Sequence, residues 1–156
     1  MSHQENVGVR GFFRLQITEK DKVVGDSGWQ QNQITNEGFR NFMARLLGAI
    51  AGSSQITHFA LGTGGAPAAG DTTLAGEVEV RQAVTAATSS NSKAVQFTGT
   101  FASSNSFVTN TQNISNIALA ATSTKDAATI FAGNTYASSA VATNQNVNVT
   151  YTINFA

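Results

Sequence analysis

The sequence predicts a mainly β protein: one β-sandwich or jelly-roll-like domain of about eight strands with a single amphipathic α-helix. Three observations predict this fold class. Apolar and polar residues alternate near both ends of the chain, one segment between them has helical spacing, and the connections are rich in serine, threonine and asparagine. Alternation with a period of two is typical of a strand with one buried face, whereas a period near 3.6 is typical of a helix.

The two clearest strand patterns lie at opposite ends of the chain. Near the N-terminus, Phe13, Leu15 and Ile17 alternate with polar residues, and a charged turn leads into a second apolar stretch from Val23. This combination predicts a hairpin. Near the C-terminus, alternation places five apolar residues on one face. These residues are Val147, Val149, Tyr151, Ile153 and Phe155.

Weaker strand patterns occupy the middle of the chain. We expect strands over residues 56–61, 78–85, 95–101, 114–120 and 129–132, because each is short and rich in apolar or β-branched residues.

The chain is expected to contain one domain. Residues 7–156 show neither an internal repeat nor a proline-rich linker. The polar residues 1–6 are expected to form an N-terminal arm, because chain ends are poorly ordered unless a partner holds them.

One segment has the spacing of an amphipathic helix. Its large apolar residues recur every three or four positions and so form one stripe. We predict a helix over residues 36–48, with Thr35 as its N-cap. We expect the stripe to lie in the core, where Leu46→Ala would cost ~2–5 kcal/mol. The stripe consists of Phe39, Phe42, Met43, Leu46, Leu47 and Ile50.

The composition argues against several classes of function. Nine basic and nine acidic residues give a formal net charge of zero, and 12% of the residues are charged. A neutral surface argues against nucleic acid and membranes as partners. The chain has no cysteine, which excludes disulfides and thiolate chemistry. Because the first residues lack an apolar signal core, we expect synthesis in a cytoplasm.

Two motifs suggest enzymes but lack the residues that the chemistry needs. Residues 25–28, Gly-Asp-Ser-Gly, match the tetrapeptide around a chymotrypsin-type nucleophile. Such a serine needs a base, and the only upstream histidine is His3. Residues 62–65 form a glycine-rich loop, but neither a lysine nor a helix N-terminus follows in the way that phosphate binding requires. We interpret both motifs as turns.

Other polar residues give no clearer sign of a site. Asp71, Glu77 and Glu79 could gather around a hard cation such as Ca²⁺, although their spacing matches no loop motif. His58 has no second histidine within reach in the sequence, and we expect Trp29 to anchor a core or an interface. The sequence therefore predicts a protein that is not an enzyme and has no cofactor.

Three segments resemble a recurring class of structural proteins from tailed bacteriophages. Residues 28–38 (GWQQNQITNEG) precede the helical pattern, and residues 56–64 (ITHFALGTG) precede an Asp-Thr-Thr-Leu sequence at residues 71–74. Residues 144–155 (NQNVNVTYTINF) close the chain. The resemblance is nearest to capsid decoration, or cement, proteins.

The resemblance implies a homotrimer that binds the major capsid protein on the exterior of the assembled head and stabilises it. The polar connections over residues 103–113 and 123–128 are candidate contacts between subunits, because neutral side chains hydrogen-bond without desolvating a charge. The arm that would dock on the capsid consists of Met1, Ser2, His3, Gln4, Glu5 and Asn6.

Two alternatives stay open. The same patterns occur in tail, baseplate and tail-fibre components of phages. A carbohydrate-binding β-sandwich module would need an exposed aromatic platform, and the chain has one tryptophan and two tyrosines.

Overall fold

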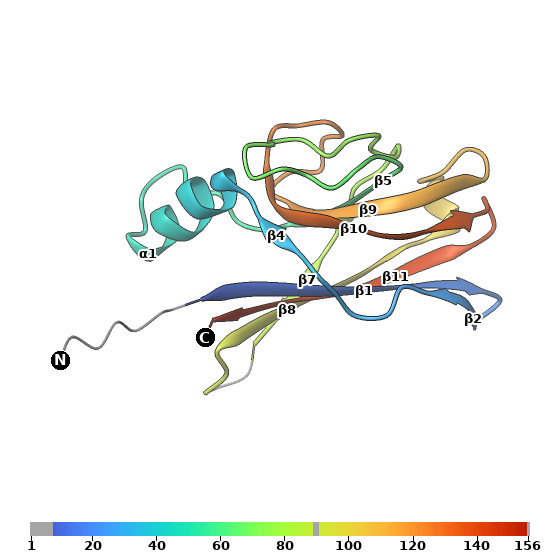
Figure 1. The fold of residues 1–156 in the computed structure, drawn as a ribbon, viewed down its shortest axis with the longest axis horizontal. Helices are drawn as coiled ribbons and strands as arrows, with labels where there is room; N and C mark the ends of the chain where they lie inside the picture. The colour runs from blue at the N-terminus through green and yellow to red at the C-terminus, as the bar shows by residue number, and fades with distance from the viewer. Residues whose placement is uncertain (1–7, 89–90, 156) are drawn as a thin grey trace.

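Two antiparallel sheets form the body of the protein in the computed structural model, which describes residues 8–88 and 91–155. The sheets lie one above the other, as Figure 1 shows, so the expected β-sandwich is confirmed. The first sheet has the order β2 (Lys22–Asp26), β1 (Val9–Glu19), β11 (Asn146–Phe155), β8 (Ala94–Phe101) and β7 (Thr85–Ala87), and β3 (Gln30–Gln31) also pairs with β1.

The second sheet is built mainly from the middle of the chain. Its centre is the long antiparallel pair β9 and β10, and a 3₁₀ turn at Ser103–Asn105 precedes β9. The order is β4 (Gln33–Ile34), β10 (Ile130–Val141), β9 (Gln112–Ala120), β5 (His58–Gly62) and β6 (Gln82–Ala83).

The first and last strands of the chain are neighbours in the first sheet. β1 and β11 pair antiparallel, with Phe13 opposite Tyr151 and Leu15 opposite Val149. These side chains are buried, because the alternation of both strands directs their apolar residues to the same face. The rings of Phe13 and Tyr151 stack with centroids 5.7 Å apart. The strand patterns at both ends of the sequence are thus confirmed.

The core lies between the two sheets. From the second sheet, Phe59, Leu61, Ile117 and Leu119 are fully buried. Phe59 stacks on Tyr151 of the first sheet at a centroid distance of 6.4 Å. One apolar core therefore unites strands that are distant in the sequence.

The sequence predicts one strand over residues 78–85, and this prediction is wrong. The structure has the short strands β6 and β7 instead, preceded by a loop. The backbone N–H of Val78 donates to Leu61, and that of Glu79 donates to Phe107, so this stretch does not follow one strand partner. The side chains of Glu77 and Arg81 form a buried ion pair at this point, which holds the chain in its irregular path.

A helical segment lies at one end of the sandwich, near the start of β1 and the end of β11 (Figure 1). Residues Gly38–Ala44 form a π-helix, and α1 (Arg45–Leu47) continues it. Thr35 acts as the expected cap, because its Oγ1 accepts a hydrogen bond of 3.0 Å from the Gly38 N–H.

The prediction that the apolar stripe lies in the core is wrong for most of its residues. Phe42 is buried and Met43 is partly buried, whereas the other four side chains are exposed. In a π-helix the hydrogen bonds run from residue i to i+5, which widens each turn, so residues three positions apart, such as Phe39 and Phe42, no longer share one face. The segment also extends past the ends of the strands. The exposed members are Phe39, Leu46, Leu47 and Ile50.

Candidate docking surface

An apolar groove lies between the helical segment and the adjacent ends of β1 and β11. We call it the helix groove. Its volume is about 520 Å³. A smaller cavity of about 300 Å³ shares Met43, Leu46 and Phe155 with it and reaches inward to the buried Phe42 and Phe131. The helix groove is lined by Val9, Met43, Leu46, Leu47 and Phe155.

The base of the helical segment is fixed to the second sheet. The ring of Phe42 meets that of Phe131 edge-on, with centroids 5.2 Å apart. Thr35 Oγ1 donates towards the carbonyl oxygens of Ile130 and Phe131 at 2.9 and 3.0 Å. Position 38 must be a glycine, because a Cβ there would overlap the Phe131 carbonyl oxygen. One end of the segment is therefore held tightly.

The far end of the segment is held by its own loop. Arg45 Nη2 donates to the Ala51 carbonyl oxygen at 2.6 Å, and the Ser54 N–H donates to Asn41 at 3.0 Å. Asn41 Nδ2 in turn donates to Glu37 Oε1 at 2.7 Å. These bonds fix the backbone of the segment and of the loop that follows it.

Exposed apolar side chains gather at this end of the protein. Leu47 is 90% exposed and Leu46 is 42% exposed, so two neighbouring leucines contribute to one exposed apolar patch. In the described part of the chain, the large apolar side chains that are exposed at this end are Phe39, Leu46, Leu47, Ile50 and Phe155, and those around β2 are Val23, Val24 and Trp29.

The elements around the helix groove carry more basic than acidic residues. Arg40 and Arg45 lie on the helical segment. The carbonyl oxygen of Lys93 accepts a hydrogen bond from the N–H of Phe155, another groove residue. Glu37 is the acidic residue of the segment, and Asn41 donates to it. The groove is thus apolar with a basic surround.

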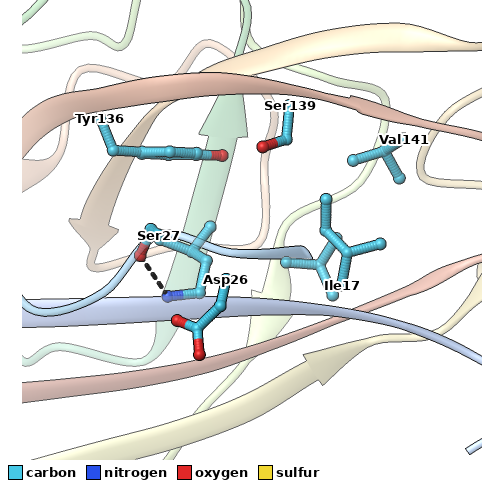
Figure 2. A pocket seen from close by; sticks show the side chains of 8 residues that line it. Ile17, Asp26, Ser27, Tyr136, Ser139 and Val141 are labelled. Carbon is cyan, nitrogen blue, oxygen red and sulfur yellow. Dashed lines mark hydrogen bonds between the residues drawn. The ribbon is translucent and has the colours of Figure 1, made fainter. Parts of the chain in front are cut away.

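The Gly-Asp-Ser-Gly motif is a turn between β2 and β3. Ser27 Oγ accepts from the Leu15 N–H at 2.9 Å and donates to the Gly28 carbonyl oxygen at 2.7 Å. Figure 2 shows Ser27 and Asp26 below Tyr136 and Ser139 of β10. The cavity between them has a volume of about 10 Å³, room for roughly one water molecule. No histidine is among the described residues that line it.

Asp26 supports this turn and does not act on Ser27. Its carboxylate accepts from Arg14 at 2.5 Å and from Gln16 Nε2 at 3.0 Å. These hydrogen bonds, led by that from Arg14, hold the pKa of Asp26 well below its usual range. The Gly28 N–H also donates to Asp26, and Gly28 has a positive φ of 64°. The motif thus serves the turn geometry.

The glycine-rich loop after β5 is also structural. The N–H groups of Thr63 and Gly64 donate to Gly76 and Ala75, both at 3.1 Å. A phosphate loop needs such N–H groups free for its ligand. Asn116 Nδ2 donates to Gly65 and Ala75 and ties the loop to β9. The residues that would bind phosphate are therefore engaged with the protein.

The acidic residues Asp71, Glu77 and Glu79 do not meet at one point. Asp71 accepts from the Ala68 N–H, Glu79 pairs with Lys125 at 3.1 Å, and Glu77 pairs with Arg81 at 2.5 Å. Over residues 8–88 and 91–155 no group of three potential metal ligands occurs. This geometry does not favour the cation site.

The sequence reasoning missed the role of Arg81. Its guanidinium donates to both oxygens of Glu77 and to the Thr122 and Ala127 carbonyl oxygens, which ties two loops together. The signal was present in the sequence, since Arg81 is the one arginine after position 45 and follows Glu77 by four residues.

The remaining candidates are scattered. His58 contacts Thr57, with Nδ1 2.8 Å from its Oγ1, and burial, aided by the charge of Arg81, lowers its pKa. Trp29 is exposed and so does not anchor the core. The segments 103–113 and 123–128 are mostly exposed and lie largely in loops, although Phe107 and Val108 are buried and residues 112–113 begin β9. The arm over residues 1–6 lies outside the described residues.

Models of protein families, characterised protein sequences and solved structures give no match to this chain. The helices in the described ranges are all too short or too polar to cross a membrane. The fold and the helix groove define a β-sandwich protein with an apolar surface at one end.

Proposed function

We propose that this protein is a structural component of a tailed-phage virion, and specifically a decoration protein that binds the major capsid protein on the exterior of the assembled head. The observation that carries the proposal is the helix groove with its exposed leucines. Uncovered apolar side chains held on a fixed scaffold are typical of surfaces that bind another protein. The motifs that resemble phage structural proteins give the class of partner.

The rest of the surface fits attachment to a lattice. The outer face of the first sheet carries polar, mostly neutral side chains, among them Thr150 and Thr152 of β11 and Gln96 and Thr98 of β8. Such a face has little charge to desolvate when subunits pack closely. A decoration protein binds only the assembled lattice, so its binding free energy adds to the stability of that lattice.

Binding to heads tests the proposal directly. Purified protein should co-sediment with assembled heads that lack it and should not bind unassembled capsid subunits. Heads stripped of the protein should lose thermal tolerance and regain it on re-addition. Unchanged tolerance would contradict a stabilising role. A copy number of tens rather than hundreds per virion would favour the tail or baseplate alternative.

The arm and the oligomeric state are separate parts of this proposal. Removing residues 1–6 takes away little apolar surface, so the thermal midpoint should stay the same while binding to heads weakens. A cyclic trimer would engage three equivalent capsid surfaces, which makes the second and third contacts intramolecular. Light scattering and a particle reconstruction measure the stoichiometry. A monomer in both would contradict the trimer.

A further inference from the structure

We propose that the helix groove receives a large apolar side chain from an acidic segment of a partner protein. The inference deepens the proposed function, in which this partner is the capsid lattice, and names the chemistry that the docking segment must have. It rests on the shape of the groove, on its exposed apolar lining and on the charges around it.

The shape of the groove indicates an inserted side chain. Its volume of about 520 Å³ is large enough for an aromatic or leucine side chain together with neighbouring backbone, and an adjoining cavity of about 300 Å³ shares part of its lining. A bilayer surface would contact projecting residues such as Leu47 but would leave this hollow unfilled. A protein segment with one large apolar residue fills it and also covers Leu46 and Phe155.

The charges around the groove indicate which charge the partner segment carries. Arg40, Arg45 and Lys93 lie on or beside the elements that line it, and among the described residues there the carboxylate of Glu37 opposes them. Carboxylates flanking the inserted side chain would meet these cations across the rim of the interface. Complementary charges steer a partner to its site, and like charges exclude partners that carry the wrong charge.

The same charges argue against a second copy of this chain as the occupant. Two helix grooves brought face to face would place two sets of arginines close together, and like charges across an interface are costly. The helix groove is therefore better suited to a different chain than to the contacts of the proposed trimer.

The groove needs no rearrangement before it binds. Phe42 and Thr35 fix the base of the helical segment, and Arg45 fixes its loop. A surface that is already ordered avoids the entropic cost of ordering on binding. A contact of modest size can therefore contribute to the binding free energy, particularly when several copies bind one lattice.

Two dyes with the same ring system test the chemistry of the groove without any partner. Anilinonaphthalene sulfonate carries a negative charge, and phenylnaphthylamine lacks it. We expect the anionic dye to bind more tightly at low ionic strength and to lose this advantage at high ionic strength. Leu47→Asp should weaken both dyes about tenfold, and Arg40→Gln should weaken only the anionic one.

Matched variants at the other end of the molecule control for general effects. Val24 is exposed in β2 and Lys22 is exposed beside it, so Val24→Asp and Lys22→Gln make the same chemical changes away from the groove. Both should leave dye binding unchanged. Equal binding of the two dyes, or an equal loss in Val24→Asp, would overturn the groove as an apolar site for anions.

Binding to heads then separates this inference from the proposed function. If the unaltered protein binds heads, Leu47→Asp and Arg40→Glu should weaken binding at least about tenfold, while the β2 controls bind normally. Normal binding by the groove variants would overturn this inference and leave the decoration role intact. If the unaltered protein does not bind heads, the decoration role fails, and the dye results alone decide the groove chemistry.

Binding to a lipid membrane is the remaining outcome that would contradict a protein partner. Vesicles of phosphatidylcholine and phosphatidylserine should not bind the protein. Vesicle binding that Leu47→Asp abolishes would overturn the inference in favour of a lipid surface.

Discussion

β11 and the helical segment each carry a row of large apolar side chains, and the two rows lie in opposite environments. In β11, Val149, Tyr151 and Ile153 are almost completely buried. In the helical segment, Leu46 and Leu47 are exposed and line the helix groove. The two rows are equally apolar in sequence, so apolarity alone does not account for the difference.

The difference comes from the neighbours of each element. β11 lies between β1 and β8, and the second sheet covers its inner face, so its inward side chains from Val147 to Ile153 are buried. The helical segment is fixed at its base by Phe42 and then continues past the ends of the strands (Figure 1). A periodic apolar pattern therefore predicts an element, and burial requires a second surface within reach.

The largest loss of stability should come from a core residue of β1, the strand that pairs with β11. Phe13→Ala removes a fully buried ring that stacks on Tyr151, and should cost about 3–5 kcal/mol of unfolding free energy. Phe39→Ala removes the same atoms from the exposed helical segment, and should cost less than about 1 kcal/mol. Chemical denaturation of both variants gives the two values, and similar losses would break the comparison.

A second test asks whether burial also determines how much stability is lost when one partner of an ion pair is replaced. Arg81→Met leaves Glu77 buried without its partner and should cost about 3–5 kcal/mol. Lys125→Met disrupts the more exposed pair with Glu79 and should cost less than about 1 kcal/mol. Thermal and chemical denaturation measure both. Combining Arg81→Met with Glu77→Leu should recover part of the loss, because no unpaired charge is then buried.

The third test sets the two apolar rows directly against each other. Ile153→Ala in β11 should cost about 2–5 kcal/mol. Leu46→Ala in the helical segment should cost less than about 1.5 kcal/mol, because its side chain is already partly in water. This value replaces the larger loss that the sequence pattern alone predicts. A loss for Leu46→Ala as large as that for Ile153→Ala would mean that the groove is closed in solution.

The smallest expected effect is a pH dependence of stability that comes from His58. This residue begins β5 and is only partly buried. Its pKa is lowered in the folded state, chiefly by burial, so the unfolded chain binds the proton more tightly. This contribution to stability is fully present above the ordinary histidine pKa and is lost as the pH falls through the lowered value. The melting temperature should therefore drop between neutral and mildly acidic pH, and His58→Gln should reduce that drop.

Much of the sandwich could be predicted from the sequence. The alternation around Phe13 and Tyr151 is local, and it specifies which face of each strand is buried whatever the strand order. The glycine-rich turns and the cap at Thr35 were predicted for the same reason, since each depends on a few adjacent residues. The irregular course of residues 78–85 could not be predicted, because the pair Glu77–Arg81 gains its importance from the loops around it.

The sequence by itself determined that a helical element follows Thr35 and that its apolar residues recur at helical spacing. Only the tertiary structure decided that Phe42 is buried while Leu46 and Leu47 stay exposed. Burial is a relation between two surfaces: it depends on how far the segment extends past the sheets and on the π-helical turns that rotate its side chains. The helix groove exists for that reason, and no local pattern of residues could have specified it.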